Sequence, residues 1–357
     1  MKTLYLECNM GTAGDMLMAA LYELMTESEK HDFLETMNRL FPGVEIHPRQ
    51  AVTCGITGTH MDVTVCGEEE HSHDVALGCG QNQGHIHEHH HDHDHDHGHH
   101  HHTAPADITA LLETLDIPAE VRDSAKSIYA RIADAESKAH GMPVEQIHFH
   151  EVGAMDAVAD VVGVCLAIHM LHPDCITASP VHLGSGQIRC AHGIVPVPAP
   201  ATAHLLEGVP CYTGEIRGEL CTPTGAALLT QFAEAFGPMP VMSLKKTGYG
   251  VGKKEFPAAN CVRAFWGESG DPQQAEIVEL RVENGAVSAV VTATGAVFGA
   301  KAVILCSGTY LDGRTIVGEC IQSSGPDGMH ASLPLAERLR ALGLPLRRFK
   351  TGTPPRV

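Results

Sequence analysis

The sequence is poor in aromatic and basic residues. Phe, Trp and Tyr make up 4% of its 357 residues, and 24 Lys and Arg stand against 43 Asp and Glu, which gives a formal net charge of −19. Nucleic acid phosphates and anionic membranes attract basic surfaces, so we expect this chain to bind neither through its surface as a whole. An acidic chain attracts cations instead.

Long apolar runs and a disulfide framework are also missing. The longest apolar run, at residues 161–171, is too short to cross a bilayer and includes His169. Residues 1–7 lack the apolar core of a signal peptide. The 12 cysteines are scattered without a CxxC pair, which indicates reduced thiols. We therefore expect a cytoplasmic protein without a transmembrane segment.

The residues that are present suit a folded chain of two or three domains. The hydrophobic content of 43% is enough for buried cores. We expect a mixed α+β (α/β) fold in which helices flank a sheet. The predicted parts are one domain formed by residues 1–66 and 104–268, an insertion at 67–103, a linker at 269–280 and a small, incomplete α/β tail at 281–357.

The motif HFHEVGAMDAVAD, which begins at His148, concentrates side chains that bind metals. If its first residues end a strand, His148 and His150 point to the same face. A helix that follows would place Asp156 and Asp160 on one face near its N terminus. With Glu151, these groups could hold a divalent cation or perform acid and base chemistry. Alternatively, the aspartates only favour the helix N terminus and the histidines serve local hydrogen bonds.

The insertion at residues 67–103 differs in composition from the rest of the chain. Its few apolar side chains cannot offset the entropy of ordering it, so we expect a disordered loop. Clustered imidazoles flanked by aspartates bind Ni²⁺, Zn²⁺ and Cu²⁺. A purification tag is the alternative, but tags lie at chain termini and are seldom interrupted by aspartates. The predicted metal ligands here are His85, His87, His89, His90, His91, His93, His95, His97, His99, His100, His101 and His102.

Three turns are candidate anion sites, because each exposes backbone N–H groups near a helix or in a glycine-rich stretch. The first lies between a strand expected at 3–8 and a helix expected at 17–25. The second precedes the alternating prolines at 196–200. The third begins a helix that is predicted to end at Gly237. Tight turns, a plain connection and a helix cap are the structural alternatives. The predicted residues are Gly11, Gly14, Asp15, His192, Thr222, Thr224 and Gly225.

Further elements follow from apolar periodicity and from proline and glycine. Helices are expected at 29–40 and twice within 107–140, where Pro118 starts the second and Gly141 ends it. Strands are expected at 55–65, 175–183 and 260–266. Residues 245–252 are predicted to form a glycine-rich turn, whose Lys245 and Lys246 either meet a phosphate or lie on the solvated surface.

Several motifs occur in the order found in LarC-type nickel insertion proteins. They are GTAGDM, the histidine-rich insertion, HFHEVGAMDAVAD, GSGQIRCAHGIVPVPAPAT, GELCTPTGAA and KTGYGVGKKEFPAANCVRAFWGE. From residue 1 to about 280 the chain resembles the N-terminal part of these proteins. The resemblance implies a nickel chelatase of the lyase class, which uses CTP to insert Ni²⁺ into pyridinium-3,5-bisthiocarboxylic acid mononucleotide and so makes the nickel-pincer cofactor of lactate racemase.

The implied reaction sets two tasks for the protein. Nickel exchanges nitrogen or oxygen ligands for two soft sulfurs and a carbanion of the substrate, so the ion must be delivered and an anionic nucleotide must be held. In this family a C-terminal part with the CTP and nickel chemistry normally follows. Here it is replaced, so we expect an incomplete enzyme whose missing domain a separate chain could supply. A homo-oligomer is compatible with the sequence.

After about residue 280 the chain resembles an internal piece of the MnmG/GidA-type flavoprotein, which modifies tRNA wobble uridine. The motifs are VENGAVS, AKAVILCSGTYL, SSGP and LRRFKTGTPPRV. AKAVILCSGTYL, at 300–311, is predicted to be a buried strand that enters a glycine turn. No GxGxxG turn is present to hold the FAD pyrophosphate, so we expect neither FAD nor tRNA chemistry from this fused fragment. Two alternatives to the enzyme remain: a non-catalytic nickel-binding metallochaperone module, and, more remotely, an FAD-dependent tRNA-modifying protein.

Overall fold

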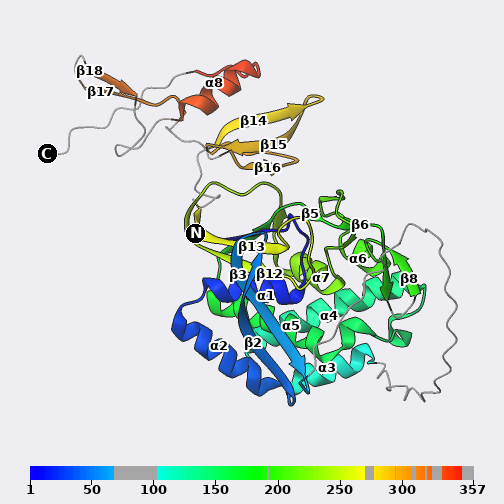
Figure 1. Ribbon diagram of the computed structural model, residues 1–357. Coiled ribbons are helices and arrows are strands. Elements are labelled where there is room, and N and C mark those ends of the chain that lie inside the picture. Colours follow the sequence, from blue (N-terminus) through cyan, green and yellow to red (C-terminus); the bar gives the residue numbers. More distant parts are fainter. Residues whose placement is uncertain are drawn as a thin grey trace, which may run out of the picture. The chain divides into compact units, whose positions relative to one another are not determined.

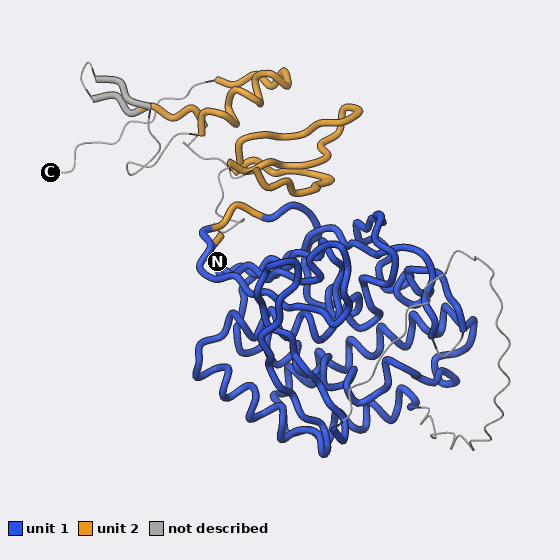
Figure 2. Tube along the Cα trace, in the orientation of Figure 1, with its two compact units in different colours: residues 1–239, 243–268 blue, residues 240–242, 269–357 orange. Residues whose placement is uncertain are grey.

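The computed structural model describes residues 1–67, 103–190, 193–269, 277–293, 295–306, 311–317, 320–323 and 332–347. Two units can be distinguished (Figure 2). Unit 1 comprises Met1–Met239 and Ser243–Glu268, and unit 2 comprises Pro240–Met242 and Ser269–Val357. The predicted insertion with its histidine ligands, and His192, lie outside the described residues.

A mixed seven-stranded sheet forms the framework of unit 1 (Figure 1). β1 lies near its centre, parallel to β4 on one side and antiparallel to β13 on the other, with Leu4 opposite Trp266. β2 and β3 form an antiparallel hairpin at one edge. In spatial order the strands are β11 (Ala235–Phe236), β4 (Cys175–Ala178), β1 (Lys2–Glu7), β13 (Cys261–Ser269), β12 (Met242–Val251), β3 (Ile56–Val65) and β2 (Val44–Thr53).

Helix α5 (Met155–Leu171) is the centre of the helical layer. It is apolar on nearly every side, which is typical of a buried helix, and it packs against α1, α4, α7 and β3. Figure 1 shows these helices gathered on one side of the sheet. The others of unit 1 are α1 (Gly14–Leu24), α2 (Glu27–Leu40), α3 (Pro105–Thr114), α4 (Ala119–His140), α6 (Pro200–Leu205) and α7 (Pro223–Phe232), with the 3₁₀ turns η1 (Val144–Gln146) and η2 (Glu151–Gly153).

Short strand pairs connect α5 to α7 in the chain. β5 (Val181–His182) runs parallel to β9 (Cys211–Tyr212). β6 (Gly184–Ser185) pairs with β10 (Gly218–Glu219), and β7 (Gln187–Cys190) pairs with β8 (Gly193–Pro196), both antiparallel. These pairs bring the segment before α7 back toward the end of β1.

Unit 2 has a smaller core of its own, in which Leu280, Leu335 and Leu339 are buried together. β14 (Ile277–Glu283), β15 (Ala286–Thr292) and β16 (Val297–Gly299) form an antiparallel sheet. Arg338 of α8 (Leu333–Ala341) pairs with Glu279 of β14 at 2.8 Å. β17 (Arg314–Val317) and β18 (Cys320–Ser323) form a separate pair. The predicted mixed α+β class is confirmed.

Several local predictions are confirmed by the helix ends. Gly141 ends α4 in the left-handed conformation (φ 63°), which glycine adopts without strain. Thr222 caps α7 by accepting a hydrogen bond from the Gly225 N–H at 3.1 Å, and Pro223 takes the first helical position. Pro200 likewise begins α6.

Two predictions near the candidate site are wrong. His148 does not end a strand, because pairing is limited to one isolated bridge between Phe149 and Thr103, and η2 begins at Glu151. The buried Phe149 ring lies 5.9 Å from that of Tyr129, so packing of this side chain, rather than a ladder, holds the segment. Residues 245–252 form strand β12 for most of their length and not a turn.

Two further predictions fail at element ends. The helix after Thr222 stops at Phe232, and Ala235–Phe236 instead pairs with β4 at the sheet edge. Residues 300–306 form no strand, and the Ile304 side chain is 87% exposed. An apolar run predicts burial only if a surface is present to cover it.

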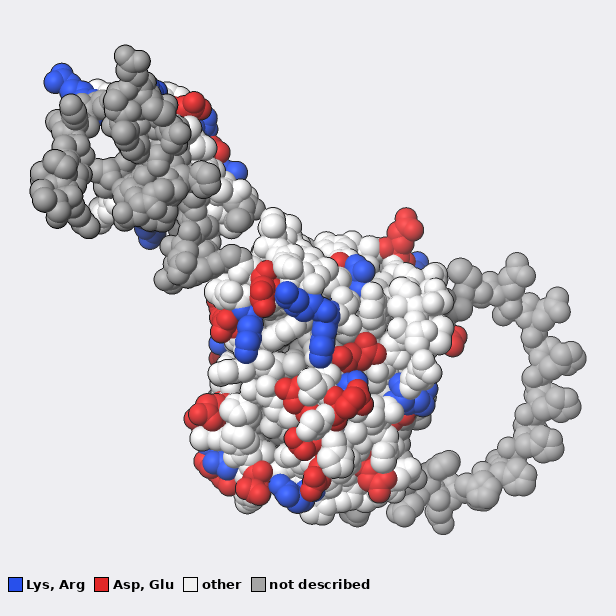
Figure 3. Space-filling model, turned by 90° about the vertical axis from the view of Figure 1, so that its left-hand side faces the viewer, with Lys and Arg blue, Asp and Glu red and all other residues white. Residues whose placement is uncertain are grey.

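The described surface carries charges of both signs. On the face drawn in Figure 3, basic side chains of unit 1 lie among acidic ones. No helix in the described part of the chain has the length and apolar character needed to cross a membrane. The cytoplasmic location stays a prediction.

Candidate functional site

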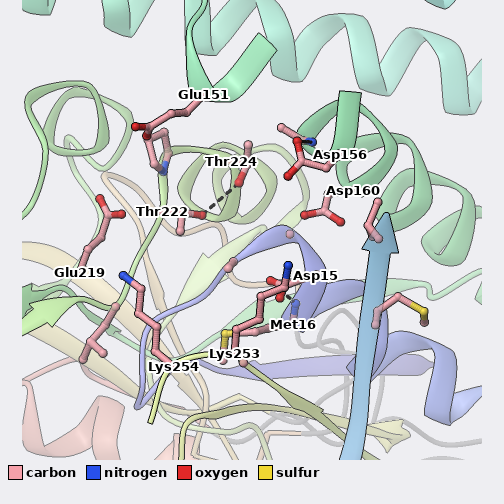
Figure 4. Close-up of a pocket in the computed structure, with 18 of the residues that line it drawn as sticks. Asp15, Met16, Glu151, Asp156, Asp160, Glu219, Thr222, Thr224, Lys253 and Lys254 are labelled. Carbon is pink, nitrogen blue, oxygen red and sulfur yellow. Dashed lines mark hydrogen bonds between the residues drawn. The ribbon is translucent and has the colours of Figure 1, made fainter. Parts of the chain in front are cut away.

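The N-terminal ends of three helices of unit 1 meet at a cavity of about 290 Å³ (Figure 4). Asp15 lies in the first turn of α1, Asp156 in that of α5, and Pro223 begins α7. The first N–H groups of a helix lack intrahelical partners and carry partial positive charge. Other parts of the lining come from β3, η2, the segment before α7 and the loop after β12, among them Met61, Glu151, Glu219, Lys253, Lys254 and Asn260.

Two glycine-containing turns are joined behind this cavity. The Thr12 N–H donates to the Leu220 carbonyl at 2.9 Å, and the Thr222 N–H donates to the Thr12 carbonyl at 3.0 Å. A Cβ atom at Gly225 would lie 2.3 Å from the Thr12 oxygen, so only glycine permits this approach. Gly11, with φ +73°, packs equally closely on Leu220. The first and third predicted anion turns therefore form one structural unit.

Three carboxyl groups line one side of the cavity. Oδ1 of Asp15 accepts from the Met16 N–H at 2.8 Å, and Oδ1 of Asp156 accepts from the Ala157 N–H at 2.7 Å. Each group thus faces the N terminus of its own helix. Asp160 lies one turn further along α5, and Figure 4 shows its carboxyl group between those of Asp15 and Asp156. Its Oδ1 atom is buried and has no hydrogen-bond partner among the described residues.

Burial is the main reason why these three carboxyl groups are weaker acids than usual. It raises the pKa of Asp15 and of Asp156 above the ordinary carboxyl value. Burial, together with the negative charges of Asp15 and Asp156, holds the pKa of Asp160 well above its usual range. The positive charge of Lys253 lowers the pKa of all three. The cluster therefore favours a bound proton or another positive charge.

Cationic groups line the same cavity. Lys253 and Lys254 follow β12, and Asn260 fixes their loop by donating from Nδ2 to the Lys254 carbonyl at 2.9 Å. Thr222 and Thr224 present hydroxyl groups 3.0 Å apart at the beginning of α7. Ammonium groups, hydroxyls and helix N–H groups are the donors that bind phosphate. The cavity therefore offers carboxyl groups that suit a cation and donor groups that suit an anion.

The structure brings together only part of the predicted site. Gly14, Asp15, Glu151, Asp156, Asp160, Thr222 and Thr224 line the cavity, whereas His148, His150, Gly11 and Gly225 are not part of its lining. Among the described residues, no group of three or more His, Cys, Asp or Glu side chains has the geometry of a preformed metal site. The assignment of metal ligands to this block stays a prediction.

Sequence reasoning missed the two lysines that line the cavity. It singled out Lys245 and Lys246, but Lys246 donates to the Leu24 carbonyl at 2.8 Å and Lys245 lies 4.0 Å from Glu268. The pair that lines the cavity is Lys253 and Lys254, directly after Gly252. A glycine followed by two lysines was a readable signal, since it places two cations at a strand end. Glu219 and Asn260 gave no comparable signal.

A family model described as nickel insertion protein matches residues 4–302, which include every residue that lines the cavity. The chain belongs to the nickel insertion protein family. Among its relatives is the pyridinium-3,5-bisthiocarboxylic acid mononucleotide nickel insertion protein of Desulfitobacterium hafniense, 35% identical over 281 residues, or 77% of this chain and 61% of the relative. The protein of the same description from Geobacillus kaustophilus is 38% identical over 269 residues, or 75% and 60%.

The match does not extend over the whole of the relatives. A putative nickel insertion protein of Geotalea daltonii is 37% identical over 284 residues, which are 78% of this chain and 65% of that protein. The chain thus spans less than two thirds of the length of these relatives. A second family model, glucose inhibited division protein A, matches residues 273–357. No solved structure gives a significant match.

Proposed function

We propose that this chain takes part in inserting Ni²⁺ into pyridinium-3,5-bisthiocarboxylic acid mononucleotide, the substrate named for its relatives. The observation that carries the proposal is the cavity of unit 1, whose lining combines carboxyl and ammonium groups. Lys253, Lys254 and the N terminus of α7 suit the phosphate of a mononucleotide. The carboxyl groups suit its positively charged pyridinium ring or an accompanying cation.

Nickel is a substrate in this scheme. The histidines between His85 and His102, outside the described residues, are proposed to capture the ion. Imidazole holds nickel at neutral pH and releases it when protonated or when better ligands are offered. Two thiocarboxylate sulfurs of the nucleotide are softer donors, so transfer from histidine to the nucleotide is favourable. His148 and His150 are proposed to serve as intermediate ligands for nickel.

We further propose that turnover uses CTP, which the resemblance to LarC-type proteins implies. The matches to the two family models overlap at residues 273–302, and we propose that the nickel insertion sequence joins a flavoprotein fragment there. The fragment is not proposed to bind FAD or to modify tRNA. Sequencing DNA across the codons for residues 273–302 tests the junction.

The function is tested by incubating the full chain with the mononucleotide, CTP and Ni²⁺, alone and with the C-terminal part of the Desulfitobacterium relative. Mass spectrometry should find the nickel-containing nucleotide in at least the supplemented reaction. Lys253→Gln should lower its formation by about 10-fold or more through weaker phosphate binding, while the surface variant Lys245→Gln should behave as wild type. Bound nickel without product in both reactions would favour the metallochaperone alternative.

A further inference from the structure

The acidic side chains that line the cavity offer oxygen donors. Asp15, Asp156, Asp160 and Glu151 line it, and Figure 4 shows Thr222 and Thr224 between Glu151 and the three aspartates. His148 and His150 do not line it, although they precede Glu151 in the chain. Oxygen donors select hard cations such as Mg²⁺ and Mn²⁺, whereas nickel favours imidazole and sulfur. The donor set therefore differs from that expected for the nickel cargo.

The carboxyl oxygen of Asp160 supplies a second, independent observation. Oδ1 of Asp160, a residue of the cavity lining, is buried and has no hydrogen-bond partner among the described residues. The α1 backbone approaches the same side chain so closely that a Cβ at Gly14 would lie 2.7 Å from Asp160 Cβ. A buried carboxylate is stable only when a hydrogen bond or a positive charge compensates it. The fold thus leaves one carboxyl oxygen of a cavity-lining residue unsatisfied.

Lys253 and the N terminus of α7 show how the coordination of such a cation would be completed. Mg²⁺ is usually held by one or two carboxylates together with substrate phosphates and water, and does not require a cage of three protein ligands. We propose that Asp15 and Asp160 bind a hard divalent cation of the Mg²⁺ or Mn²⁺ class, which bridges them to a phosphate group bound by Lys253 and the N terminus of α7. Asp156, whose negative charge also acts on Asp160, would contribute through a water molecule. Only the identity of the phosphate, that of the mononucleotide, rests on the proposed function.

The cation site is tested by titrating the full chain with Mn²⁺ alone and following free Mn²⁺ by electron paramagnetic resonance. Wild type should bind one more Mn²⁺ per chain than Asp160→Asn, whose folding is checked by its melting curve. Asp134→Asn, which removes an exposed carboxylate of α4 that pairs with Lys138 at 2.9 Å, is the matched control and should equal wild type. Equal stoichiometry and affinity in wild type and Asp160→Asn would overturn the site.

The phosphate bridge is tested by repeating the titration with nicotinic acid mononucleotide, a stable pyridinium mononucleotide. The nucleotide should tighten Mn²⁺ binding by about 10-fold. Lys253→Gln should bind Mn²⁺ a few-fold more tightly without nucleotide, because a repelling charge is removed. In the presence of nucleotide, the same variant should lose the 10-fold enhancement. Unchanged Mn²⁺ affinity on adding nucleotide to wild type would refute the bridge.

The outcomes separate this site from the proposed function. If the chain binds Mn²⁺ through Asp160 but yields no nickel-containing nucleotide in either reaction, the cation site is supported and the proposed nickel insertion activity is refuted. If the chain makes the product but Asp160→Asn binds Mn²⁺ in the same way as wild type, the activity is supported and the cation site is refuted.

Discussion

Asp160 is unfavourable for the stability of the fold but favourable for the cation binding that we propose. Its carboxyl group is buried beside those of Asp15 and Asp156, and one of its oxygens lacks a hydrogen-bond partner within the described structure. Like charges held together in a poorly solvated place destabilise the folded state. A side chain that stability alone would not select is a frequent mark of a binding site.

Replacing Asp160 with Asn should therefore stabilise the metal-free protein. Asn keeps the shape and can still accept the hydrogen bond that Asp160 receives from the Asp15 backbone, while its amide can donate to the neighbouring carboxylates. A gain of about 1 kcal/mol would raise the melting temperature by about 2–4 °C. Circular dichroism in buffer with a chelator measures this change. A lower melting temperature than wild type would show that the charge is already compensated.

The buried thiols provide a prediction that is independent of the cavity. Burial raises the pKa of the Cys8 thiol to about 12, and Cys221 is shifted in the same direction for the same reason. Because an unfolded thiol ionises near pH 9, the folded state keeps its proton over the interval between these values. Stability from this source is complete below about pH 9 and is lost as pH rises toward 12.

Thiol labelling at pH 8 should accordingly be selective. Maleimide should react within minutes at the exposed Cys54 and Cys66, whereas Cys8 and Cys221 should react only after denaturation. Peptide mass spectrometry identifies the labelled positions. Rapid labelling of Cys8 in the folded protein would contradict the burial described here.

At the residue scale the sequence predicted what lies close along the chain. Asp156 and Asp160 were expected on one helix face from their spacing, and both line the cavity. Their partners Asp15 and Lys253 lie about a hundred or more residues away, and no local pattern connects them to α5. The common face of the histidines was inferred from an alternating strand, which is absent here because the buried Phe149 holds the chain instead.

At the scale of elements, the joined turns between α1 and α7 are the feature most sensitive to a small substitution. Gly225→Ala would place Cβ against the Thr12 carbonyl, to which Thr222 also donates a hydrogen bond. We expect a loss of about 1–3 kcal/mol in the free energy of unfolding, measured by urea denaturation. Gly237→Ala is the matched control, because nothing lies within 4 Å of its Cβ position. Equal effects of the two variants would argue against the close approach.

Element types were predicted better than element ends. Helix caps at Thr222 and Gly141 depend on local chemistry and were predicted correctly. β12 was mistaken for a turn because its glycines suggested one, whereas Gly250 is small in order to admit α1, with the Met16 carbonyl 1.8 Å from a hypothetical Cβ. Glycine within a strand marks such close packing as well as turns, and a single sequence does not distinguish the two.

At the scale of the whole molecule, nickel binding and stability should be separable. Deleting residues 71–102 removes 14 of the 26 histidines and few apolar side chains. The composition predicts that most bound Ni²⁺ is lost, while the melting temperature stays nearly unchanged. Metal analysis after gel filtration and a melting curve test both points. A large loss of stability would contradict the prediction that this segment forms a disordered loop.

The family could be read from motifs, but the division of the chain could be read only in outline. The change of sequence was expected near residue 280, while the matches to the two family models overlap at 273–302 and unit 1 ends its main part at Glu268. The burial of residues 300–311 could not be judged from their apolar character, since Ile304 is 87% exposed. Burial depends on neighbours that a short stretch of sequence does not specify.

The convergence of three helix N termini gives the cavity a direction. Asp15 and Asp156 neutralise the positive ends of α1 and α5 by accepting their first N–H groups, whereas α7 is capped by the uncharged Thr222. A zwitterion such as a pyridinium mononucleotide would be aligned by this field, with its phosphate toward α7 and its ring toward the aspartates. The reversed pose would oppose like charges at both ends. The same field that attracts the molecule would therefore determine which of its ends is presented for reaction.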